Sequence, residues 1–119
     1  MSLECDADTI GFFHDILKDL YKDTPNPITQ GSSYNLLDVC AKRPFTYVYN
    51  FEPFPHILQK AAVLFESIIR FHPFTDGNKR TALLTIYYFL LWNGYKLVIP
   101  NDAAEFALKV AVNQKSRIR

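Results

Sequence analysis

The sequence predicts an all-α protein, a mainly helical bundle that carries one short β-hairpin. Apolar residues recur at helical spacing in four stretches, residues 8–21, 33–42, 56–71 and 78–92. Only the stretch 45–51 is dense in the aromatic and β-branched residues that favour strands. The chain has 119 residues, 49% of them hydrophobic, which is enough for one core. We therefore expect a single domain over residues 1–119.

Charge and cysteine content limit which cellular compartment and which classes of partner are expected. The formal net charge of +1 argues against bulk affinity for nucleic acid. Cys5 and Cys40 lack CxxC spacing, so a reducing compartment is expected rather than a disulfide framework. No signal peptide is visible, and the most apolar run, 82–92, is shorter than the roughly 20 residues that span a bilayer. These features predict a cytoplasmic protein that binds neither nucleic acid nor membrane.

The first two helices are predicted from caps and apolar spacing. The first should begin at Asp8, as its N-cap, and end near Tyr21, with His14 off the apolar stripe and at the surface. Its core-facing residues are expected to be Phe13, Ile16, Leu17, Leu20 and Tyr21. A short second helix should follow Ser33, whose hydroxyl caps it, and should end before Pro44. Its inward residues are expected to be Leu36, Leu37 and Cys40.

The two longer helices follow the aromatic stretch 45–51, which should form an extended segment or a small hairpin. In helix 56–71 the outward residues are expected to be Gln59, Lys60, Glu66 and Arg70. Its buried stripe should hold Ile57, Leu58, Ala61, Leu64, Phe65, Ile68 and Ile69. Helix 78–92 is hydrophobic nearly all round, which predicts a central buried helix that Asn93-Gly94 ends. An extended piece at 95–99 and a last helix from Asp102 should follow.

The most informative residues lie between these helices, in the stretch His72-Pro73-Phe74-Thr75-Asp76-Gly77-Asn78-Lys79-Arg80. His72 can accept a proton near neutral pH, and Asp76 is an oxygen ligand of the kind that Mg²⁺ prefers beside phosphates. Asn78 is a good N-cap, and the free N–H groups at a helix start bind anions. A simple turn is the alternative, but a plain turn needs no His, Lys and Arg together. The stretch therefore contains the parts needed to move a phosphorus-containing group onto a hydroxyl.

This 72–80 stretch resembles the Fic/Doc family signature, His-Pro-Phe-x-(Asp/Glu)-Gly-Asn-(Gly/Lys)-Arg, at every position. The resemblance covers residues 36–94 and implies a Fic/Doc-like helical fold. It also implies a role for each signature residue. His72 would deprotonate the target hydroxyl, Asp76 would hold Mg²⁺, and Phe74 would anchor the loop in the core. Gly77, Asn78, Lys79 and Arg80 would bind the phosphates of ATP or another nucleoside triphosphate.

The residues that follow favour the Doc (death-on-curing) branch of the family. That branch carries Asn-Lys-Arg-Thr-Ala-Leu, present here from Asn78 to Leu83, whereas AMP-transferring members usually have Gly at the Lys79 position. In Doc-type members a terminal phosphate is transferred to a protein Ser or Thr hydroxyl, and the target is elongation factor Tu. AMP transfer (AMPylation) and a non-catalytic binding module stay open as alternatives.

Two partners are also implied by the resemblance. Many Fic proteins carry an inhibitory Ser/Thr-x-x-x-Glu-(Gly/Asn) motif, and none of the glutamates here fits it. A separate antitoxin is therefore expected, as in Doc-type toxin–antitoxin pairs. The stretch 45–51 matches the position of the flap with which Fic-like enzymes hold a target segment by strand addition. Tyr47, Val48 and Tyr49 would form that flap, unless the stretch simply covers the core.

Overall fold

The computed structural model describes residues 4–98, and within them its regular secondary structure is almost wholly helical, as predicted. The elements are α1 (Ala7–Tyr21), α2 (Tyr34–Lys42), the 3-10 helix η1 (Arg43–Phe45), α3 (Ile57–Phe71) and α4 (Asn78–Trp92). Residues 95–98 have no regular structure. The rest of the expected extended piece, and the last helix expected from Asp102, lie outside the described residues. None of the described helices is long and apolar enough to cross a membrane.

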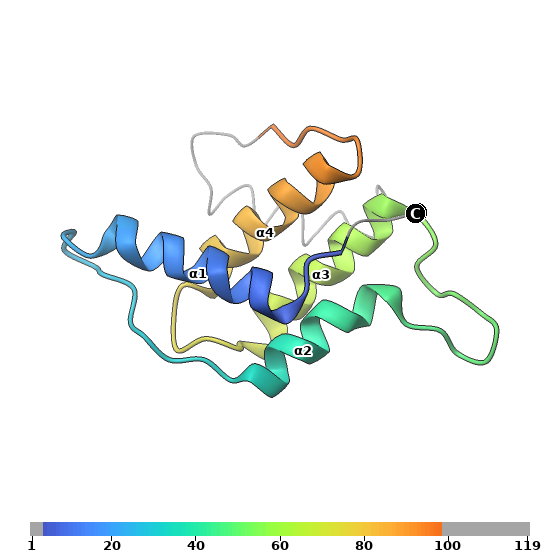
Figure 1. The fold of residues 1–119 in the computed structure, drawn as a ribbon, viewed down its shortest axis with the longest axis horizontal. Helices are drawn as coiled ribbons and strands as arrows, with labels where there is room; N and C mark the ends of the chain where they lie inside the picture. Colours follow the sequence, from blue (N-terminus) through green and yellow to red (C-terminus); the bar gives the residue numbers. More distant parts are fainter. Residues whose placement is uncertain (1–3, 99–119) are drawn as a thin grey trace.

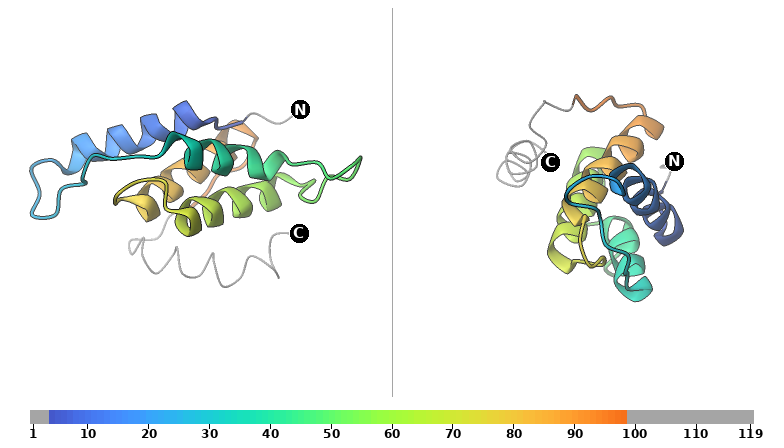
Figure 2. Two further views of the ribbon diagram at one scale, coloured as in Figure 1. Left: turned by 90° about the horizontal axis from the view of Figure 1, so that it is seen from below. Right: turned by 90° about the vertical axis from the view of Figure 1, so that its left-hand side faces the viewer.

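Helices α3 and α4 form the centre of the fold. They make the most extensive contact in the described chain, and α1 and α2 pack around them (Figures 1 and 2). The largest fully buried side chains come mainly from this pair and include Phe65, Phe89, Leu64 and Ile68. Because a short connection joins α3 to α4, their shared core holds both ends of the 72–80 stretch.

Helix α1 begins two residues earlier than predicted. Its N-cap is Asp6, whose carboxylate accepts hydrogen bonds from the backbone N–H and the hydroxyl of Thr9, both at 2.8 Å. The inward face is also different, because Ile16 and Leu20 are exposed while Ile10 and His14 are buried. The prediction that His14 lies at the surface was wrong: its side chain is only 3% exposed.

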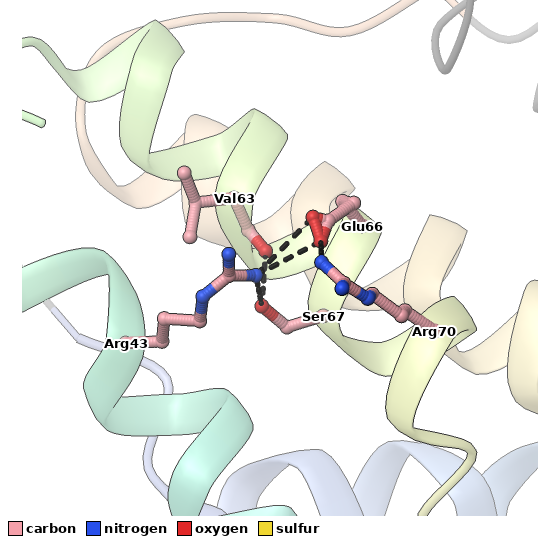
Figure 3. Close-up of polar contacts among 5 residues, drawn as sticks. All are labelled: Arg43, Val63, Glu66, Ser67 and Arg70. Atoms are coloured by element: carbon pink, nitrogen blue, oxygen red, sulfur yellow. Dashed lines mark hydrogen bonds and ion pairs between the residues drawn. The ribbon is translucent and has the colours of Figure 1, made fainter.

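Helix α2 forms as predicted. Ser33 is its N-cap and its hydroxyl accepts from the Leu36 N–H at 3.4 Å. Leu37 and Cys40 are buried, and Cys40 is a free thiol whose pKa burial raises to about 11. Figure 3 shows the hydrogen bonds and ion pair that join Arg43, at the end of α2, to α3. Arg43 donates to the Glu66 carboxylate at 2.9 Å and to the Ser67 hydroxyl at 3.0 Å.

Helix α3 buries one residue that the sequence placed outside. Lys60 is 2% exposed, and its ammonium donates to the Glu52 carboxylate at 2.6 Å and to the backbone carbonyls of Pro44 and Phe54. A buried ammonium is tolerated only when such partners satisfy it. Lys60 therefore anchors the loop that precedes α3. Leu58, expected in the buried stripe, is exposed instead.

The predicted hairpin is reduced to a single turn. Val48 and Phe51 exchange backbone hydrogen bonds of 2.7 and 2.9 Å and form one isolated antiparallel bridge. Tyr49 at the turn has a positive φ of 52° and a side chain that is 96% exposed. Tyr47, Val48 and Phe51 are exposed as well, so this turn does not cover the core, whereas Phe45 at the start of the stretch packs against it.

Candidate active site

His72 ends α3 and opens the polar loop. It is the C-cap of the helix, with left-handed backbone angles (φ 55°, ψ 58°), and its N–H donates to the Ile68 carbonyl at 3.2 Å. A positive φ is uncommon for a residue other than glycine. The His72 side chain is exposed and has no hydrogen-bond partner among residues 4–98. Its imidazole is therefore accessible from solvent.

Phe74 anchors the loop in the core, as the resemblance implied. Its side chain is buried, and the amide of Asn78 bonds both backbone groups of this residue. The Asn78 Oδ1 accepts from the Phe74 N–H at 3.1 Å, and its Nδ2 donates to the Phe74 carbonyl at 2.9 Å. The N-cap of α4 is therefore Gly77 and not Asn78. Asn78 stays in the site as the residue that ties the loop to the helix.

The segment 28–33 supports the loop along its length. The Ser33 N–H donates to the Pro73 carbonyl at 2.8 Å, and the Thr75 N–H donates to the Gly31 carbonyl at 3.0 Å. Ser32 and Phe74 form an antiparallel bridge. A side chain added at Gly31 would collide with the Thr75 side chain, so the two segments approach as closely as only glycine allows.

Asp76 is held by this same segment. Its Oδ1 accepts from the backbone N–H of Thr29 and its Oδ2 from the Thr29 hydroxyl, both at 2.7 Å. The Thr29 hydroxyl bond lowers the pKa of the Asp76 carboxyl, with smaller contributions from the Thr29 N–H, His14 and Arg80. The carboxylate therefore stays charged and fixed in direction at the surface, next to the start of α4.

Removing the Thr29 hydroxyl should release this carboxylate. In Thr29→Val we expect the pKa of Asp76 to rise toward its ordinary value, because the charged form loses an acceptor bond. The stabilisation linked to this lowered pKa is present above the ordinary pKa of an aspartate and is lost as the pH falls through the lowered one. A ¹³C NMR titration of the Asp76 carboxyl measures the change. Thr29→Ser, which keeps the hydroxyl, should titrate like the wild type, and equal pKa values in all three proteins would contradict this account.

The start of α4 presents unpaired donors. Gly77 takes left-handed angles (φ 76°), and its carbonyl accepts the first helical bond, from the Thr81 N–H at 2.9 Å. Within residues 4–98 the N–H groups of Gly77, Asn78, Lys79 and Arg80 have no acceptor. A Cβ at Gly77 would lie 3.0 Å from Ile28, so this tight approach also needs glycine. Such a group of free N–H donors at a helix N-terminus binds anions.

Two exposed cations stand beside these donors. Lys79 makes no hydrogen bond or ion pair within the described chain, and the Arg80 guanidinium lies 4.5 Å from the centre of the Tyr21 ring. Tyr21 is the last residue of α1, so this contact joins α1 to the first turn of α4. The two cations and the N–H groups form a site suited to phosphates.

The comparisons agree with this geometry. The Fic/DOC family profile matches residues 4–90. This chain belongs to the Fic/Doc family. The match includes α1 and the segment 28–33, both of which lie before the residues on which the sequence resemblance was based. The toxin named Doc of Mycolicibacterium smegmatis is 37% identical over an alignment of 92 residues, and the match covers 69% of this chain and 71% of the relative. No solved structure matches the chain.

A site for Mg²⁺, which the resemblance implied, would need ligands from outside the protein beside those of residues 72–80, called the Fic/Doc loop from here on. Residues 4–98 contain no group of three or more His, Cys, Asp or Glu side chains that could hold a metal. Asp76 offers one oriented carboxylate beside the unpaired N–H groups at the start of α4. Mg²⁺ commonly binds through one or two carboxylates, with substrate phosphates and water filling its other positions. The residues present therefore fit this ion.

The sequence-predicted flap is not brought to the Fic/Doc loop. The turn at Val48–Phe51 precedes α3 and the loop follows it, and Figure 1 and the left-hand view of Figure 2 show the two segments at opposite ends of that helix. With 15 residues, α3 separates them by about 22 Å. Target docking by Tyr47, Val48 and Tyr49 stays a prediction, and it requires a target segment that runs along α3.

Two contributors to the loop were missed from the sequence. His14 stacks on Phe74 and contacts Asp76, and Thr29 holds the Asp76 carboxylate. The inward position of His14 could have been predicted, because Ile10, His14 and Leu17 follow the i, i+4, i+7 spacing of one helix face. Nothing in the local sequence marks Thr29, whose partner lies 47 residues away.

Proposed function

We propose that this Fic/Doc protein is a Doc-like toxin of a toxin–antitoxin pair, acting in the cytoplasm. It transfers the terminal phosphate of a nucleoside triphosphate to a Ser or Thr hydroxyl of a target protein, with elongation factor Tu as the proposed target. The observation that carries this proposal is the Fic/Doc loop itself. A free imidazole, an oriented carboxylate and a set of unpaired N–H donors with two cations occur within nine residues.

The chemistry follows from these groups. His72 takes the proton from the target hydroxyl as its oxygen forms a bond to the terminal phosphorus. The bond from that phosphorus to the bridging oxygen breaks, and the nucleoside diphosphate leaves with the electron pair. The N–H groups at the start of α4, with Lys79 and Arg80, bind and orient the charged phosphates. Asp76 would hold Mg²⁺, which neutralises phosphate charge when it is bound.

AMP transfer is the second candidate, because the same loop could present the α-phosphate instead. The hydroxyl would then attack the α-phosphorus, and pyrophosphate would leave. Lys79 favours the terminal phosphate, since AMP-transferring members usually have Gly at this position. Lys79 is exposed and unpaired within the described residues, so its ammonium is available to a phosphate. A non-catalytic binding module would have no use for the free His72 imidazole.

The name of the relative, Toxin Doc, supports the toxin proposal. Induced expression of this chain in bacteria should stop growth, and expression of the His72→Asn variant should not. Co-expression of the neighbouring open reading frame, as the proposed antitoxin, should restore growth. Normal growth of cells that accumulate the intact wild-type chain alone would count against a toxin. Growth arrest by the His72→Asn variant at equal protein level would count against toxicity through catalysis.

A further inference from the structure

We propose that His14 is a positioning residue that fixes the orientation of the Asp76–Gly77 peptide bond, and thereby the direction of the Gly77 N–H. The proposal rests on the proposed function, because it assigns that N–H to phosphate binding. His14 belongs to α1, far in sequence from the 72–80 stretch.

The His14 ring and its Nε2 atom both interact with the Fic/Doc loop. Its ring lies parallel to the ring of Phe74, with an interplanar angle of 2° and 3.9 Å between centroids. Its Nε2 is 3.1 Å from the backbone carbonyl oxygen of Asp76. A carbonyl oxygen only accepts, so Nε2 must carry a proton and donate. The parallel ring contact fixes the plane in which this donor points.

The bond to the carbonyl also determines where the next N–H points. A peptide unit is planar and trans, so the carbonyl of Asp76 and the N–H of Gly77 point in opposite directions. With the carbonyl held by His14, the Gly77 N–H faces away from His14, and it has no acceptor among residues 4–98. It is then available to an anion together with the next N–H groups of α4.

The Asp76–Gly77 peptide needs a hydrogen bond to fix its orientation, because its second residue is glycine. Gly77 tolerates both positive and negative φ, so its backbone alone does not exclude a flipped peptide. Thr29 holds the Asp76 carboxylate but makes no bond to the Asp76 carbonyl. Among the described residues, His14 is the side chain that holds this carbonyl. Without its donor the peptide would sample both orientations, and the Gly77 N–H would be lost from the anion site for part of the time.

Two variants separate the donor from the ring. His14→Phe keeps an aromatic ring on Phe74 but has no donor, and His14→Gln keeps an N–H donor at the ε position without the ring. In the full chain, ¹⁵N–¹H NMR should show the Gly77 amide signal moved or broadened in His14→Phe and near its wild-type position in His14→Gln. ADP without metal serves as the anion probe, and His14→Phe should bind it about 3- to 10-fold more weakly, with a smaller loss in His14→Gln.

The wild type provides a test that needs no variant to fold. The ¹⁵N spectrum of the His14 ring should show a protonated Nε2, and an unprotonated Nε2 would overturn the proposal. An unmoved Gly77 amide in His14→Phe, or equal changes in both variants, would overturn it too, because the donor would then have no separate role. The NMR signals and the binding of ADP can be measured without any transfer reaction. If the ring and amide signals are as expected but no phosphate is transferred, the proposed function is wrong while the positioning role of His14 is supported.

Discussion

Replacing His72 with Asn should lower the rate of transfer about 10²–10⁴-fold, the usual cost of losing a general base. The fold should be unchanged, because the His72 side chain is exposed and Asn tolerates the left-handed backbone that this position requires. The rate of label transfer from ATP to protein measures the first effect, and urea denaturation measures the second.

A second histidine serves as the control for His72→Asn. His56 is exposed and precedes the first residue of α3, at the opposite end of the helix from His72. His56→Ala should transfer label at a rate close to that of the wild type. If His72→Asn keeps the wild-type rate, the imidazole is not the base and the assignment of His72 is wrong.

Replacing Phe74 with Ala should cost about 3–5 kcal/mol in the free energy of unfolding, as expected for a buried phenylalanine. The loss includes the ring contact with His14 and leaves a cavity beneath the loop. Because Asn78 bonds to the backbone of Phe74, the start of α4 should lose order as well, and transfer should fall with stability. Urea denaturation of the purified variant measures the stability change.

Phe12 provides a matched control for the Phe74 substitution. Phe12→Ala removes the same atoms as Phe74→Ala, but from a side chain that is 60% exposed. Phe12→Ala should cost less than about 1 kcal/mol, since surface substitutions rarely exceed this. Equal losses in the two variants would show that Phe74 does not anchor the loop.

Local patterns in the sequence predicted the helices and located the loop. Apolar spacing and the Ser33 cap placed α2, α3 and α4 to within about one residue, because helix caps and buried stripes are properties of neighbouring residues. The side chains within the 72–80 stretch could be assigned chemical roles from their types alone. Its resemblance to the Fic/Doc signature supplied the family, which the comparison with the family profile then confirmed.

What the sequence did not predict depends on contacts between distant residues. The buried Lys60 looked like a surface residue because two of its three partners are backbone carbonyls, which leave no trace in sequence. Asn78 looked like an N-cap, yet its amide is used to bind Phe74. The contacts of Asp76 with Thr29 and with His14 join residues 47 and 62 positions apart. Only the folded chain brings these groups together.

The central claim, transfer of a terminal phosphate by the Fic/Doc loop, is tested most directly by the origin of the transferred group. The purified chain is added to bacterial lysate with Mg²⁺ and either γ-labelled or α-labelled ATP, and His72→Asn is run beside the wild type. We expect protein to be labelled from the γ position alone, and only by the wild type. Label from the α position would mean AMP transfer and would contradict the role given to Lys79. Absence of label from both, with elongation factor Tu present and the chain folded, would contradict the phosphotransfer proposal itself.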